Sequence, residues 1–198
     1  MACQSKSPED LPKYKKKFRT QIASFEDQKV KADERVTEGV DMLNGLQGAL
    51  ENAKNVDQEF KRVYTKWERV NKQVEDLNKE YEDLKQDADN LFAAMGRQTA
   101  SLNDQETRKE LDQALATTKA DYNKTLAKTA EAIGQLRSLH AEAVDVVKAL
   151  EVAIALGQIA EINSGLASIE SKVAGIMEDL NSTISESKEL YESRIGNI

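Results

Sequence analysis

The chain has few prolines, cysteines, histidines and aromatic residues, and each scarcity limits what it can be. Its two prolines, Pro8 and Pro12, both fall in the first dozen residues, so residues 13–198 contain none. Proline inside a helix costs about 3 kcal/mol. Charged residues make up 32% of the chain and aromatic residues 5%, a composition typical of helices with narrow apolar stripes. These absences predict an all-α protein.

Other absences exclude whole classes of protein. With one cysteine, the chain forms no internal disulfide and no cysteine-based metal cluster. No run of 18 apolar residues occurs in the sequence, so we expect no segment that spans a bilayer. The net charge of −7 disfavours a nucleic-acid partner, because binding to phosphates needs a basic face.

The single cysteine, Cys3, lies in the sequence Met1-Ala2-Cys3-Gln4-Ser5. A small residue before a cysteine is what remains of a bacterial lipoprotein cleavage site once the signal peptide is removed and a start methionine is added. We therefore expect Cys3 to be the lipidated first residue of the mature protein. An unpaired thiol on a flexible tail is the alternative. On this interpretation residues 1–11 form a flexible lipid-anchor tail, and residues 12–198 form one helical-bundle domain.

Positive charge is concentrated near the N-terminus. Residues 1–19 carry six basic and two acidic side chains, whereas residues 20–100 have a net charge of −5 and residues 101–198 a net charge of −6. Most of these cations belong to a short run that we call the neck: Lys13, Tyr14, Lys15, Lys16, Lys17, Phe18 and Arg19. Cations interleaved with aromatic residues suit an anionic membrane surface, where each cation contributes about 1 kcal/mol. We predict that the five cations of the neck contact a membrane; an ordinary solvated helix start is the alternative.

Apolar residues between Val56 and Met95 recur at alternating spacings of four and three. This 3.5-residue period is typical of a helix that packs along other helices. We call such a row of apolar positions a seam. Its residues here are Val56, Phe60, Val63, Trp67, Val70, Val74, Leu77, Tyr81, Leu84, Ala88, Leu91 and Met95. We expect Trp67 to be buried.

Three further seams lie out of register with this one. The first contains Ile22, Phe25, Val36, Val40, Leu43 and Leu50, the second runs from Leu111 to Ile154, and the third runs from Ile159 to Leu180. The shifts in register predict turns near 53–56, 97–103 and 155–158, with Gly96 marking the second turn. Helices are therefore expected at about 12–52, 56–98, 104–155 and 158–195, with Asn55 as the candidate N-cap of the second and Asp104 or Asn103 as that of the third.

The first junction contains neither glycine nor proline, so a turn and a kink in one long helix are both open. With a turn, the chain is an elongated antiparallel bundle of four helices. With a kink, it is a three-helix antiparallel coiled coil that resembles the crescent-shaped, membrane-bending dimers of BAR-domain proteins. The fold class is elongated and all-α in both cases, with three to four long helices.

The sequence offers little that could carry catalysis. His140, the only histidine, falls on the seam that runs from Leu111 to Ile154, and we interpret it as a packed core residue. A carboxylate-bridged metal site needs a glutamate three residues from a histidine on a core face, and Glu142 and Glu151 do not have that spacing from His140. No phosphate-binding loop, nucleophile elbow or zinc motif occurs. We predict no catalytic residue, metal or cofactor, and no enzymatic activity; a carboxylate-bridged metal enzyme is the competing class.

From about Val30 onward the chain resembles an uncharacterised family of bacterial envelope lipoproteins. The similarity is most specific in the segments 89–92 (Asp-Asn-Leu-Phe) and 159–170 (Ile-Ala-Glu-Ile-Asn-Ser-Gly-Leu-Ala-Ser-Ile-Glu), and Cys3-Gln4-Ser5 is similar to the mature start of those proteins. The resemblance implies an all-helical fold and a lipid anchor, and it transfers no catalytic residue. Gln4 rather than aspartate after the cysteine implies the outer membrane, by resemblance to lipoprotein sorting in well-studied bacteria.

These observations together predict a non-enzymatic, lipid-anchored protein at the periplasmic face of the outer membrane. Its partner would be membrane lipid, bound through the N-terminus, and its role that of an elongated coiled-coil scaffold. The alternative is a BAR-like homodimer that binds and shapes membranes, although the acidic body argues against broad electrostatic adhesion.

Overall fold

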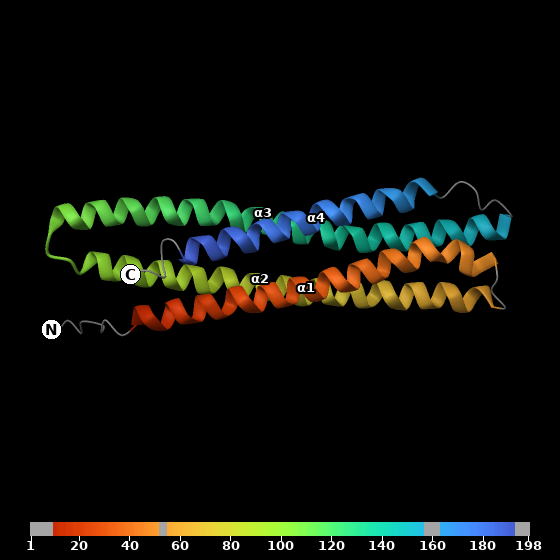
Figure 1. The fold of residues 1–198 in the computed structure, drawn as a ribbon, viewed down its shortest axis with the longest axis horizontal. Helices are drawn as coiled ribbons and strands as arrows, with labels where there is room; N and C mark the ends of the chain where they lie inside the picture. Colours follow the sequence, from red (N-terminus) through yellow and green to blue (C-terminus); the bar gives the residue numbers. More distant parts are fainter. Residues whose placement is uncertain (1–9, 52–54, 157–162, 193–198) are drawn as a thin grey trace.

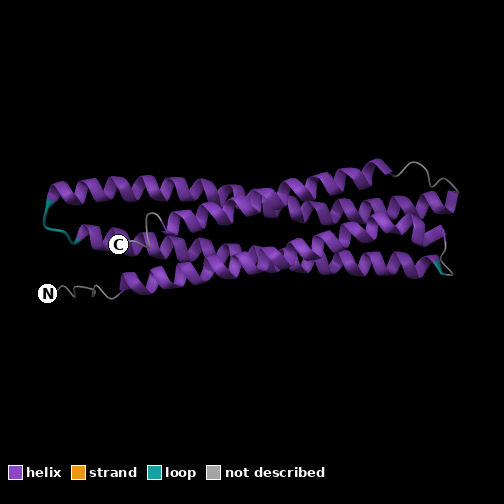
Figure 2. Ribbon diagram, in the orientation of Figure 1, coloured by secondary structure: helices purple, strands orange, loops and turns teal. Residues whose placement is uncertain are grey.

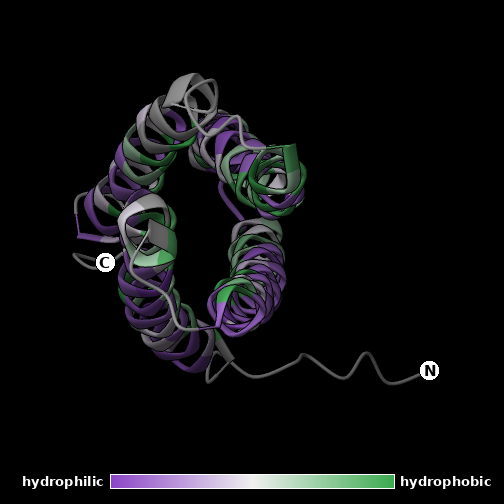
Figure 3. Cartoon of the chain, turned by 90° about the vertical axis from the view of Figure 1, so that its right-hand side faces the viewer, coloured by the Kyte–Doolittle hydropathy of each residue, from purple (hydrophilic) through white to green (hydrophobic). Residues whose placement is uncertain are grey.

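The protein is a rod of four long helices. The computed structural model describes residues 10–51, 55–156 and 163–192, and these residues contain helices and turns but no strand (Figure 2). The helices are α1 (Asp10–Glu51), α2 (Val56–Ala100), α3 (Gln105–Leu156) and α4 (Asn163–Leu190). Each helix packs antiparallel on the one before it, and α1 closes the bundle against α4 (Figures 1 and 3). The prediction of an elongated all-α bundle is confirmed.

The first helix begins slightly before its predicted start. Asp10 and Leu11 are helical, although both were assigned to the flexible tail. Pro12 lies in the first turn of α1, where backbone N–H groups have no partner within the helix, so its missing N–H costs little.

The first junction is a turn and not a kink. Helices α1 and α2 lie side by side in opposite directions (Figure 1), so the chain reverses between Glu51 and Val56. Asn55 caps α2 as predicted, because its Oδ1 accepts the backbone N–H of Gln58 at 3.1 Å. The version of the fold with one very long helix is therefore wrong. Residues 52–54 lie outside the described part of the chain.

The second turn is tighter than predicted. Helix α2 continues to Ala100, so Gly96 lies inside the helix and does not mark its end. The backbone N–H of Ser101 donates to the Gln98 carbonyl at 3.1 Å. Asp104 then caps α3 by accepting the Thr107 N–H at 2.9 Å. The predicted third turn, at 155–158, falls partly outside the described residues, because α3 ends at Leu156 and the described part of α4 begins at Asn163.

The predicted seams form the core. Every α2 seam position from Phe60 to Leu91 is buried, as are all six seam residues of α1. Trp67 is fully buried, whereas His140 is half-buried. The prediction fails at the start of α3, where Leu111 is 44% exposed. The reason is physical: among the described helices, only α2 and α3 reach this end of the rod, because their hairpin extends past α1 and α4 (Figure 1).

Candidate functional site

The neck forms the first turns of α1 and does not present one uniform face. Successive helix residues are rotated by about 100°, so seven consecutive positions point in every direction around the axis. Phe18 is completely buried, and Tyr14 packs partly against the core. Phe18, one of the two aromatic residues interleaved with the predicted membrane-contact cations, therefore belongs to the interior.

Lys17 forms an ion pair within the bundle. Its Nζ donates to Asp87 Oδ1 on α2 at 2.6 Å, and the Asp87 side chain is only 4% exposed. The hydrogen bond and the negative charge of Asp87 raise the pKa of Lys17 above its ordinary value. A carboxylate that is this buried needs a partner, so Lys17 has a structural role whatever else it touches.

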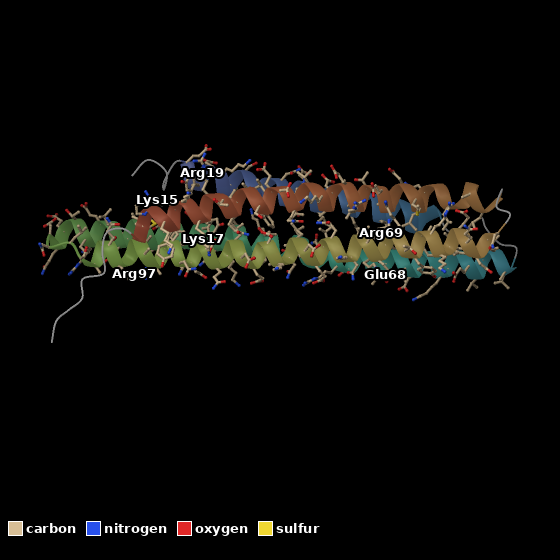
Figure 4. The ribbon with its side chains drawn as sticks, turned by 90° about the horizontal axis from the view of Figure 1, so that it is seen from below. Lys15, Lys17, Arg19, Glu68, Arg69 and Arg97 are labelled. Atoms are coloured by element: carbon tan, nitrogen blue, oxygen red, sulfur yellow. The ribbon has the colours of Figure 1, made fainter. Side chains whose placement is uncertain are left out.

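The remaining cations of the neck point in several directions around α1. Lys13, Lys16 and Arg19 are exposed, while Lys15 is half-buried. Figure 4 shows Lys17 on the side of α1 that faces α2 and Arg19 on the opposite side, toward α4. The five predicted membrane-contact residues therefore do not form one cationic surface. The exposed members remain candidates for that contact.

Antiparallel packing brings a further cation to the same end of the rod. Arg97 lies in the last turn of α2, is exposed, and appears in Figure 4 at the end of the rod that carries Lys15, Lys17 and Arg19. Sequence reasoning missed it, because Arg97 follows Arg19 by 78 residues and a separation of this size gives no local signal of proximity. The regular α2 seam, which predicts an antiparallel hairpin, is the signal that could have found it.

Polar contacts hold the start of α1 on α2. Glu80 Oε2 accepts hydrogen bonds from Gln21 Nε2 at 2.6 Å and from Ser24 Oγ at 2.8 Å. The acceptors Glu80 and Asp87 lie about two helical turns apart on α2. They fix how far α1 is shifted along α2, and so they fix where the neck lies.

A cluster of aromatic rings lies beneath the neck and joins the helices at this end. The Phe18 ring meets Tyr122 of α3 edge-on with 5.6 Å between centroids, and it lies 6.3 Å from Tyr191 just after α4. Phe92 of α2 lies 6.0 Å from Tyr122. Burial raises the pKa of the Tyr122 phenol well above its ordinary value, so its hydroxyl stays neutral. This cluster is packing and supplies no ionised group for chemistry.

The described residues offer no arrangement suited to metal catalysis. They contain no group of three or more histidine, cysteine, aspartate or glutamate side chains placed to hold a metal ion. His140 Nε2 lies 3.8 Å from Glu68 Oε1, which is too far for a direct hydrogen bond. None of the described helices is long and apolar enough to cross a bilayer. Cys3, the predicted lipidation site, lies outside the described residues.

Fold and surface together define an elongated, up-and-down four-helix bundle with a partly cationic N-terminal end. A family model described as "Protein of unknown function (DUF2959)" matches residues 9–193. The chain belongs to this family, and its resemblance to an uncharacterised helical family is confirmed. No curated protein matches the chain. No solved structure matches it either.

Proposed function

We propose that the protein is a non-enzymatic scaffold that is attached to a bacterial membrane by lipid on Cys3. The rod would project from the periplasmic face of the outer membrane and present its helical faces to partners. Lipid bound through the N-terminus is the partner that this proposal names. No cofactor takes part in it.

The observation that supports the proposal most strongly is the position at which α1 begins. Helix α1 begins at one end of the bundle, and the exposed side chains of Lys13, Lys16, Arg19 and Arg97 lie at that same end. An anchor on Cys3 would therefore hold the rod by its more cationic end. The acidic remainder of the protein would extend away from anionic headgroups, as electrostatics favours.

The distribution of charge supports the scaffold over the BAR-like dimer. A membrane-shaping dimer needs a broad cationic face, yet Lys17 and Arg19 lie on opposite sides of α1 (Figure 4). Farther along the rod, Glu68 and Arg69 alternate in sign on α2 (Figure 4). Such mixed surfaces adhere weakly to a bilayer, because neighbouring charges of opposite sign cancel within a Debye length.

The decisive experiment replaces Cys3 in the natural gene. The Cys3→Ser protein should move from the membrane fraction to the soluble periplasmic fraction, because each buried methylene of a lipid contributes about 0.8 kcal/mol to anchoring. Ser5→Ala, two residues away, is the matched control and should leave the protein in the membrane fraction. If Cys3→Ser protein stays with the membrane through a high-salt wash, lipidation is not the anchor.

Two measurements on purified protein test the competing functions. Mixing the soluble protein with anionic vesicles and cross-linking it in solution tests the BAR-like dimer, which predicts tubules and a dimer band. Metal analysis tests the enzyme class, which predicts stoichiometric iron or manganese. The scaffold proposal expects intact vesicles and no bound metal.

A further inference from the structure

The α2–α3 hairpin extends beyond both other helices at the N-terminal end of the rod (Figure 1). The pairing of Lys17 with Asp87 at 2.6 Å sets the position of α1 along α2. At 1.5 Å per residue, α2 then continues for about 10 Å past the start of α1. The hydrogen bond from Thr125 to Glu186 at 2.7 Å sets α4 on α3 in the same way. It leaves roughly the first 20 Å of α3 with no α4 beside it.

The apolar seam does not stop where the covering helices stop. Met95 and Leu102 from the α2 side and Leu111 and Leu115 from α3 line a groove of about 850 Å³. Leu111 is 44% exposed although it is a seam position of α3, and Leu102, two residues after the end of α2, is 36% exposed. Among the described residues, Leu11 at the start of α1 is the only lining residue from outside the hairpin.

The size of the groove argues against a second copy of the chain as its occupant. The uncovered stretch runs for about 10 Å on α2 and about 20 Å on α3, or roughly 15 Å on average, and a helix pair is about 20 Å wide. A face of this size gives about 300 Å² per partner, far below the roughly 800 Å² per partner of a stable interface. Both lining helices satisfy their own backbone hydrogen bonds, so the groove offers little to an extended peptide. A hydrocarbon chain needs neither a large area nor hydrogen bonds.

The N-terminal segment brings a hydrocarbon chain within reach. Cys3 precedes Leu11 by eight residues, a distance of at most about 28 Å in an extended chain. A lipid on Cys3 is therefore tethered close to the groove, and tethering raises its effective concentration there. We propose that the groove shelters an acyl chain carried by Cys3 when no membrane is present. This inference rests on the proposed lipid anchor.

The groove is open along its length, so it covers a hydrocarbon chain less completely than a bilayer does. Because hydrophobic stabilisation scales with the apolar area removed from water, the bilayer competes successfully for the same chain. The groove would therefore hold the chain in aqueous surroundings and release it at a membrane. Its place beside the start of α1 suits that transfer, since the tail enters the rod there.

The affinity of the groove for hydrocarbon can be measured on the purified, unlipidated protein. The probe is 11-(dansylamino)undecanoic acid, whose fluorescence rises in apolar surroundings. We expect saturable binding that Leu111→Gln weakens at least tenfold. Leu156→Gln is the matched control, because Leu156 lies on the same helix at the other end of the rod and is 67% exposed. Leu102→Gln gives a second variant of the groove, and circular dichroism checks that each variant is folded.

Occupation by a chain on Cys3 can be tested because this cysteine is the only one. Protein labelled there with hexadecyl maleimide should bind the dansyl probe at least tenfold more weakly than protein labelled with N-ethylmaleimide. Equal binding by the two conjugates would overturn the proposal, as would a probe affinity that Leu111→Gln leaves unchanged. Self-association of the unlabelled protein that Leu111→Gln abolishes would assign the groove to a second copy instead. Failure of the lipid anchor itself appears only in the Cys3→Ser fractionation and changes none of these binding results.

Discussion

The indole ring of Trp67 in α2 packs so closely on Gly39 of α1 that no side chain fits between them without a shift. A Cβ atom at position 39 would lie 3.3 Å from Trp67 Cε2 and Cζ2 and 3.2 Å from Val70 Cγ2. Trp67 is fully buried, so the ring cannot swing into solvent. Gly39 therefore allows the two helices to approach each other, whereas a Cβ atom at Gly45 would meet nothing within 4 Å.

This difference predicts opposite effects for two substitutions in the same helix. Gly39→Val should lower the free energy of unfolding by about 1–3 kcal/mol, the usual cost of overpacking a core. Gly45→Ala should raise it by about 0.5–1 kcal/mol, because alanine is the better helix former. Urea denaturation followed by fluorescence of the only tryptophan measures both. Gly39→Val protein as stable as the unmodified protein would show that the contact is not tight.

Two buried tyrosines should respond differently to the loss of their hydroxyl groups. Tyr81 donates a hydrogen bond to the Leu126 carbonyl at 3.1 Å, so Tyr81→Phe should cost about 1 kcal/mol of unfolding free energy. The Tyr122 hydroxyl is buried and has no partner in good hydrogen-bonding geometry among the described residues, although the buried Ser187 hydroxyl is near enough to lower its pKa against the larger effect of burial. Tyr122→Phe should therefore be neutral within about 0.5 kcal/mol or stabilising. Thermal denaturation of the two variants tests whether Tyr81→Phe is the less stable of the two. A larger loss of stability for Tyr122→Phe would contradict the prediction.

Adjacent lysines in the neck should separate stability from membrane binding. Lys17→Gln leaves the buried Asp87 carboxylate without its cation and should lower the free energy of unfolding by about 1 kcal/mol. The effect is modest because the lysine side of the pair is open to solvent. Lys16 is exposed, so Lys16→Gln should leave stability unchanged and instead weaken binding to vesicles that contain phosphatidylglycerol.

Chemical denaturation and vesicle co-sedimentation provide the two readouts for this pair. The weaker binding of the Lys16→Gln protein should disappear at high salt, where surface charges are screened. Equal free energies of unfolding for the two variants would mean that the ion pair between Lys17 and Asp87 does not stabilise the fold. Unchanged vesicle binding by the Lys16→Gln protein would show that Lys16 does not contribute to membrane binding.

The sequence was sufficient to predict the helices and most of the core. A 3.5-residue period is a local property, so the α2 seam from Phe60 to Leu91 could be read directly. Asn55 could be identified as a cap, and the cap of α3 could be narrowed to Asp104 or Asn103. The period does not reveal where the covering helices end. Leu111 follows the same pattern as Tyr122 along α3, yet only Tyr122 has α1 and α4 beside it.

The neck was harder to predict because its roles depend on contacts between distant parts of the chain. Lys17 and Lys16 are chemically alike in the sequence, and the separation of their roles depends on Asp87, which lies 70 residues from Lys17. Phe18 stands among cations, and the sequence around it does not reveal that it is buried. Its true partner, Tyr122, belongs to α3. Helix register, which local patterns do not encode, decided both cases.

Glu186 of α4 links α3 and α4 through a contact that depends on pH. Its pKa is lowered, first because the Thr125 hydroxyl donates a hydrogen bond to its carboxylate, an effect that desolvation partly opposes. Ser182 and the charge of Lys128 lower the pKa further. The unfolded chain therefore binds a proton on this residue more readily than the folded chain. The resulting stability is present above the unfolded pKa, near 4.5, and is lost as pH falls through the folded value.

Removing the donor at Thr125 should abolish part of this pH dependence. Thr125→Val keeps the buried shape but loses the 2.7 Å hydrogen bond to Glu186, so we expect a loss of about 0.5–1 kcal/mol at pH 7. The difference between the unmodified and Thr125→Val proteins should shrink as pH falls below the unfolded pKa, since a protonated carboxyl gains less from the donor. Urea denaturation at pH 7, 5, 4 and 3 measures it. Thr117→Val, on the exposed part of α3, is the matched control and should show a difference that does not vary with pH. A Thr125→Val difference that stays constant from pH 7 to pH 3 would mean that the hydrogen bond does not stabilise the charged form of Glu186.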